Sequence, residues 1–191
     1  MPVNMLEIIA TNLGYPALQK IDANTQEVTV NDNAPDEHRF SQAAVPAILI
    51  SLYNYSTNDA GAENILHGHI NSNWTDIILG DKKNTAIQKI ISYSGGSREN
   101  AQFKMNAIAN EAVRIVKENM PLEATIEDVK KFMSNQRNKI LPFLPEAIHM
   151  GEVLNNTTLD DNTHKMEGPI SSLIRAIGEA FSEPVIDKEL K

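Results

Sequence analysis

Residues 76–97, DIILGDKKNTAIQKIISYSGGS, contain two short apolar stripes, and a glycine follows each of them. The first stripe includes Ile77 and Ile78 and starts just before the quoted stretch, at Trp74. The second repeats at intervals of three and four residues, as helices do: Ile87, Ile90 and Ile91. Gly80 is predicted to cap the first helix in a left-handed conformation, and Asn84 to begin the second as its N-cap. Gly95 is predicted to end that second helix in the same left-handed way.

A nucleotide-binding loop is the alternative for residues 80–85. Such a loop needs a strand in front of it, a glycine directly before its lysine and a serine or threonine directly after it. Here Asp81 precedes Lys82, Asn84 follows Lys83, and the apolar residues in front have helical spacing. The stretch therefore predicts two helices with a turn between them.

Similar stripes run along the rest of the chain. Those of the N-terminal half are Leu6, Ile9 and Leu13, then Ile48, Leu49 and Leu52, then Ala62, Ile65, Leu66, His69 and Ile70. Gly14 is placed to stop the first of these helices, with Pro16 beyond it. Pro46 lies just before the second stripe, which predicts that it occupies an early turn of its helix.

The C-terminal half repeats the pattern. Its stripes are Met105, Ile108, Ala109, Ala112, Ile115 and Val116, then Val129, Phe132 and Met133, and finally Ile170, Leu173, Ile174, Ile177 and Phe181. Ser97 is a predicted N-cap for the first of these helices, and Thr125 with Asp128 is spaced as a capping box for the second. Pro145 suits the first turn of a further helix that continues through Leu154.

Strand patterns are nearly absent. Only Val28-Thr29-Val30 alternates suitably, and it lies within a polar segment, residues 22–39, that is predicted to be a loop. The fold class is therefore all-α, a multihelical array of about eight short to medium helices.

The amino-acid composition is typical of a folded protein. Of 191 residues, 41% are hydrophobic and 22% charged, which is too apolar for a disordered protein. The longest apolar runs, such as residues 43–50, are far shorter than the roughly 20 residues that cross a bilayer. The N-terminus lacks a basic region of the kind that opens a secretory signal, so a cytoplasmic location without membrane association is predicted. Cysteine is absent, which excludes disulfides and thiolate catalysis.

The charge balance argues against nucleic acid as a partner. Seventeen basic residues face 25 acidic ones, for a formal net charge of −8. The local basic cluster consists of Lys130, Lys131, Arg137 and Lys139. Glu127 and Asp128 precede it and no aromatic residues interleave it for base stacking, so it is interpreted as a cationic helix end.

Two places in the sequence carry residue types that ligate metals. His67 and His69 lie about 200° apart on a helix and so do not chelate one ion together, and His69 falls on an apolar stripe, which predicts a core or boundary position. Glu146 and His149 have the Glu-x-x-His spacing of carboxylate-bridged di-iron bundles. Such a site needs a second copy, and only the imperfect Asp161-Asn-Thr-His164 is present. No catalytic, cofactor-binding or metal-ligating residues are therefore predicted, and no cofactor.

Two runs, AAVPAILISLYNYSTNDAGAENIL (43–66) and IILGDKKNTAIQKIISYSGGS (77–97), resemble the bacterial YidB-like family, a domain of unknown function numbered 937. The features that carry the resemblance are Pro46, Gly61-Ala62, Leu79-Gly80-Asp81 and Ser94-Gly95. It covers roughly residues 5–117 and implies a small multihelical bacterial domain without established activity. The chain is accordingly divided into a YidB-like helical domain, 1–120, and a C-terminal helical extension, 121–191, that packs on it.

The functional prediction is a bacterial cytoplasmic protein that is not an enzyme and acts as a helical interaction or self-assembly module. A protein partner or a homo-oligomer is the expected partner. The alternative is a metal-binding protein or metal-dependent enzyme that uses Glu146 and His149. The predicted helix 169–182 lies between Pro169 and Pro184 and must bury its apolar stripe, either on its own chain or on a second one.

Overall fold

The computed structural model describes residues 3–22 and 35–159 of the chain. The predictions that concern Val28-Thr29-Val30, Asp161 with His164, and the helix 169–182 lie outside these residues. Within the described ranges the structure contains helices and no strand, so the all-α multihelical prediction is confirmed. The α-helices are α1 (Met5–Asn12), α2 (Asp36–Ser56), α3 (Asp59–His67), α4 (Trp74–Leu79), α5 (Lys83–Ser94), α6 (Arg98–Glu118), α7 (Ile126–Ile140) and α8 (Met150–Leu154). Short 3₁₀ turns complete the described chain at Gly80–Lys82, Leu141–Phe143, Glu146–Ile148 and Thr157–Leu159.

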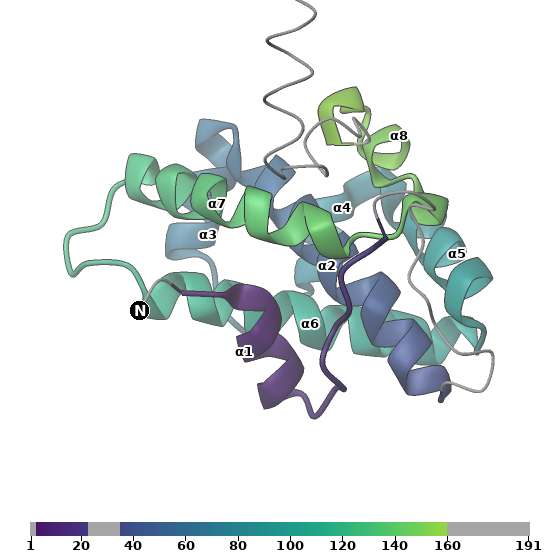
Figure 1. The fold of residues 1–191 in the computed structure, drawn as a ribbon. Coiled ribbons are helices and arrows are strands. Elements are labelled where there is room, and N and C mark those ends of the chain that lie inside the picture. Colours follow the sequence, from purple (N-terminus) through teal and green to yellow (C-terminus); the bar gives the residue numbers. More distant parts are fainter. Residues whose placement is uncertain (1–2, 23–34, 160–191) are drawn as a thin grey trace, which may run out of the picture.

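Helix α2 is the centre of the fold, with α7 on one side of it and α6 on the other in Figure 1. Every residue from Phe40 to Leu52 is buried, because α5, α6 and α7 all pack against this helix. A helix that is apolar on all sides is a core helix rather than a surface one. The remaining helices surround it and bury their own apolar stripes on it.

The prediction that Pro46 occupies an early turn is wrong, because Pro46 lies in the middle of the 21-residue helix α2. An interior proline removes one backbone hydrogen bond and costs roughly 3 kcal/mol in an exposed helix. Here the neighbours of Pro46, from Val45 to Ile50, are at most 1% exposed, so burial of the surrounding side chains offsets that cost. The helix also begins at Asp36, which corrects the predicted polar loop 22–39: its last four residues are helical.

Most of the predicted helix ends are confirmed. Ser97 caps α6 by accepting a hydrogen bond from Asn100 N, and Thr125 with Asp128 forms the complete capping box of α7. Gly80 and Gly95 end α4 and α5 with φ of 53° and 77°. Their ψ values of −126° and −171° lie outside the left-handed helical region, so the predicted left-handed conformation is wrong, although both helices end at the predicted glycines. These angles fall in a part of conformational space that glycine alone adopts readily.

Two predicted helix starts are wrong. Asn84 lies inside α5, since a 3₁₀ turn at Gly80–Lys82 continues directly into that helix and leaves no gap for an N-cap. Beyond Pro145, a 3₁₀ turn ends at Ile148 and α8 begins only at Met150. His149 between them has a φ of 47°, so the left-handed conformation of this residue interrupts the helix.

A single hydrophobic core runs from Met5 to Leu159 through the described residues. Helix α7 and the chain after it belong to this core, and α7 packs across α2. The division at residue 120 stays a prediction. Among the described helices none is long and apolar enough to cross a membrane.

Candidate binding groove

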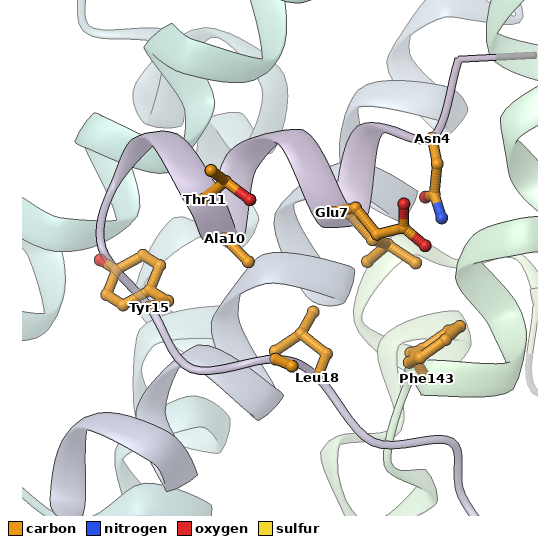
Figure 2. A pocket seen from close by; sticks show the side chains of 9 residues that line it. Asn4, Glu7, Ala10, Thr11, Tyr15, Leu18 and Phe143 are labelled. Carbon is orange, nitrogen blue, oxygen red and sulfur yellow. The ribbon is translucent and has the colours of Figure 1, made fainter. Parts of the chain in front are cut away.

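A groove of about 260 Å³ lies beside α1 (Figure 2). Its lining residues are Asn4, Leu6, Glu7, Ala10, Thr11, Tyr15, Ala17, Leu18 and Phe143, and we refer to them as the α1 groove. Figure 2 shows α1 along one side, Tyr15 and Leu18 on the segment that follows it, and Phe143 near the Asn4 end. The groove is thus built from two adjacent N-terminal segments and one residue more than 120 positions away.

The first wall is α1, which is held at both ends. Its buried face, Met5, Leu6, Ile9 and Ala10, packs into the core. At its start, Met5 N donates to Gln136 Oε1 of α7 at 3.4 Å. At its end, Asn12 Nδ2 donates to Glu111 Oε1 of α6 at 2.7 Å. With these contacts fixing the helix, Glu7 and Thr11 remain exposed on the open side of the groove.

The second wall has no regular secondary structure and depends on side chains from elsewhere. Tyr15 N donates to Ala10 O at 2.8 Å, which turns the chain back along α1. Gln19 exchanges two hydrogen bonds with the buried amide of Gln42, and Ile21 N donates to Pro142 O at 2.9 Å. Leu18 is therefore held over the core between two anchored points.

The polar side chains that line the groove are Asn4, Glu7, Thr11 and Tyr15. Asn4 Oδ1 is buried and accepts no hydrogen bond from any residue in the described ranges, although Asn4 is the N-cap of α1 and asparagine there often accepts one. At the other end, burial and, to a lesser extent, the charge of Glu37 raise the pKa of Tyr15 to about 12. Tyr15 is therefore a neutral hydroxyl at physiological pH, and the groove has a mixed lining of apolar and polar side chains.

The structure separates Glu146 and His149 from any helix that would present both on one face. Glu146 lies in the 3₁₀ turn, whereas His149 is exposed and adopts a left-handed conformation directly before α8. Among residues 3–22 and 35–159, no three histidine, aspartate or glutamate side chains gather as metal ligands would. The residue types of the alternative hypothesis are present, but the helical geometry that motivated it is not.

The other histidines lie at a helix end. His67 is the last residue of α3, and Gly68 follows it as the C-cap. His69 lies beyond the helix and is exposed, so the predicted core or boundary position is wrong. The apolar stripe ends with α3, because the chain leaves helical geometry at Gly68.

Two of the three lysines in residues 80–89 have acidic partners. Lys83 forms an ion pair with Asp76, and Lys89 lies 3.5 Å from Glu152. A second hollow of about 290 Å³ forms here between the start of α5 and α8, lined by Asp81, Lys82, Thr85, Lys89, Glu152 and Val153. Its two lysines face two carboxylates, so it lacks the excess positive charge that phosphate binding needs.

The basic cluster on α7 is largely engaged within the protein. Lys130 bridges Asp59 and Glu127, at 2.5 and 3.0 Å. Arg137 donates to Thr158 O, and Lys139 donates to Val3 O. These contacts give the cluster a structural role in holding other segments of the chain against α7.

Sequence reasoning did not identify the α1 groove. Its second wall follows the stop signal of Gly14 and carries no periodic pattern, so nothing local predicts that it returns along α1. The one available signal is Gln42, a polar residue directly before the apolar run 43–50, since a buried glutamine needs partners from another segment.

Comparison with known proteins yields no match to a family model, to a curated protein or to a solved structure. The resemblance to the YidB-like family over residues 5–117 therefore stays a prediction.

Proposed function

We propose that this protein is a non-enzymatic helical interaction module that binds a protein segment in the α1 groove. The observation that carries the proposal is the lining itself. Leu18 and Phe143 are only partly buried and, with Leu6 and Ala10, give the groove an apolar lining, and Asn4 Oδ1 is a buried acceptor that no described residue uses. An apolar hollow with a few fixed polar groups is the usual form of a recognition site.

The size of the groove favours side chains over a metabolite. Pockets for drug-sized ligands measure roughly 300–1,000 Å³, and the α1 groove, at about 260 Å³, is smaller. An apolar cavity of roughly 150 Å³ holds a benzene-sized group. The groove therefore has room for one or two aliphatic or aromatic side chains, which is how a partner helix anchors itself.

Affinity purification of the tagged full chain, with identification of bound proteins by mass spectrometry, tests the proposal. Leu18→Glu places a charge in the groove, and Leu122→Glu makes the same change at a fully exposed position outside the groove lining. We expect Leu18→Glu to lose proteins that the parent and Leu122→Glu both retain, with all three variants giving the same circular dichroism spectrum. An identical set of bound proteins from all three would contradict the groove as the binding surface.

The cellular location of the protein and the class of its partner are also proposals. The YidB-like resemblance and the absence of cysteine support the bacterial cytoplasm. The formal charge of −8 and the internal contacts of Lys130, Arg137 and Lys139 support a protein partner rather than nucleic acid. Fractionation of cells that express the tagged chain tests the location.

A further inference from the structure

We infer that the side chain which the partner protein places in the α1 groove is an arginine, paired with the carboxylate of Glu7 and stacked on the ring of Phe143. This inference rests on the proposed function, because it assumes that the groove binds a segment of another protein. It adds the chemistry that the partner must carry, which the size of the groove alone does not specify.

The open side of α1 presents acceptors that the protein itself does not use. Glu7 and Thr11 are four residues apart, which places them on the same face of the helix, and both are exposed in the groove lining. Neither side chain has a partner among residues 3–22 and 35–159. Lys139 reaches the start of α1 but donates to Val3 O, at 2.6 Å, and forms no ion pair with Glu7. The Glu7 carboxylate is therefore available to a cation that a partner brings.

The charge of the lining selects the sign of that partner group. Among the described residues that line the groove, Glu7 alone is charged at neutral pH, because burial keeps Tyr15 a neutral hydroxyl. The whole chain carries a formal charge of −8, which adds to the negative potential. Interfaces bring surfaces of opposite potential together, and an acidic partner segment would place like charges side by side. The partner residue is therefore cationic.

An aromatic ring near the same end of the groove favours arginine over lysine. Figure 2 shows Phe143 near the Asn4 end, below the turn of α1 that carries Glu7. Phe143 is only partly buried, so its ring is accessible in part from the groove. A planar guanidinium stacks on an aromatic ring and donates two parallel hydrogen bonds to a carboxylate, whereas an ammonium binds as a point charge.

The apolar part of the lining suits the rest of an arginine side chain. Leu18 is partly buried and Ala17 is exposed, and both line the groove. The methylene stem of an arginine packs on such apolar surface while its charged head remains at the polar group. The volume of about 260 Å³ exceeds the roughly 150 Å³ that holds a benzene-sized group, so the stem and the head fit together.

Nuclear magnetic resonance titration of the full nitrogen-15 chain with short peptides tests the inference. The probes are three acetylated and amidated tripeptides with leucine at both ends and arginine, citrulline or lysine in the middle. Citrulline has nearly the shape of arginine without its charge. We expect the arginine peptide to move the amide signals of Glu7, Thr11 and Leu18 and to bind about fivefold more tightly than the citrulline peptide, as an ion pair at an accessible site allows. The lysine peptide should bind more weakly than the arginine peptide.

A matched pair of protein variants assigns the effect to one carboxylate. Glu7→Gln keeps the size of the side chain and removes its charge, so the arginine and citrulline peptides should then bind equally. Glu63→Gln makes the same change at an exposed position of α3, outside the groove lining, and should preserve the fivefold difference. The spectra of both variants without peptide show directly whether each remains folded.

Three results would overturn the inference. They are equal binding of the arginine and citrulline peptides to the parent, equal binding of the arginine and lysine peptides, and no movement of the α1 signals at millimolar arginine peptide. Each of these leaves the proposed function standing if Leu18→Glu still loses outside proteins in the affinity purification. If Leu18→Glu retains every protein, the proposed function fails whatever the peptides do, so the two failures are distinguishable.

Discussion

The side-chain amide of Gln42 satisfies both backbone hydrogen-bonding groups of Gln19. Gln19 N donates to Gln42 Oε1 at 2.8 Å, and Gln42 Nε2 donates to Gln19 O at 2.9 Å. The second hydrogen of Nε2 goes to Phe143 O, also at 2.9 Å. One buried side chain on the central helix thus fixes both the irregular wall of the α1 groove and the turn that carries Phe143.

Replacing Gln42 should therefore destabilise the fold through these distant segments. Gln42→Leu keeps the approximate size and removes all three hydrogen bonds, so we expect the free energy of unfolding to fall by about 1–3 kcal/mol. Urea denaturation measures this change. Gln88→Leu, the same substitution at an exposed position of α5, is the control and should change stability by less than about 0.5 kcal/mol. Equal effects from the two variants would show that the Gln42 contacts contribute little.

Tyr15 should ionise at unusually high pH. Burial, with the charge of Glu37, raises its pKa to about 12, whereas an unfolded tyrosine ionises near 10. Because the folded pKa is the higher one, the stability that Tyr15 contributes is complete below pH 10 and is lost as the pH rises towards 12. Ultraviolet absorbance of tyrosinate is measured against pH in the parent and in Tyr15→Phe. The difference between the two titration curves gives the pKa of Tyr15. A difference curve centred at pH 10 would refute the burial of Tyr15 against the groove.

The sequence predicted those elements whose signals are local. The capping box of Thr125 and Asp128 and the Ser97 cap involve residues three apart, so the spacing alone identifies them. Pro46 was misplaced because its helix is buried on every side, and tertiary packing outweighs the local preference of proline for a first turn. The α1 groove was missed because its second wall is defined by Gln42 and Pro142, which are distant from it in sequence.

Acid should weaken the attachment of α1 to α6. The hydrogen bond from Arg114, assisted by that from Asn12, holds the pKa of Glu111 below its usual range against the opposing effect of burial. Because the folded pKa is the lower one, this contribution is present above about pH 4.5 and is lost as the pH falls through the folded pKa. We expect Glu111→Gln to cost about 1–2 kcal/mol at neutral pH, with the stability curves of parent and variant converging in acid. Thermal unfolding from pH 3 to 7 measures this, and curves that stay parallel would contradict it.

The protein as purified should hold no stoichiometric metal ion. This prediction follows from the left-handed conformation of His149, because Glu146 and His149 then do not share the continuous helix that presents a Glu-x-x-His pair in a bundle metal site. Elemental analysis by mass spectrometry measures metal content per chain. About one transition-metal ion per chain that is lost in Glu146→Ala would instead support the metal-binding alternative, with further ligands from outside residues 3–22 and 35–159.

The turn between α5 and α6 should require glycine at position 95 for its backbone alone. Gly95 has a φ of 77° and a ψ of −171°, and a Cβ built on it meets no atom within 4 Å. Substitution there causes no clash, and its cost is the conformational strain of a side chain at positive φ, roughly 1–2 kcal/mol. Gly95→Val should thus lower the free energy of unfolding by more than about 1 kcal/mol, and Gly95→Ala by a similar amount, since both carry a Cβ.

Ser92→Val, at an exposed position in the last turn of the same helix, is the control for introducing a β-branched residue and should cost less than about 0.5 kcal/mol. Urea denaturation of the three variants measures the differences. If Gly95→Ala is neutral while Gly95→Val is costly, the penalty comes from the size of the side chain, and the assigned backbone conformation is wrong.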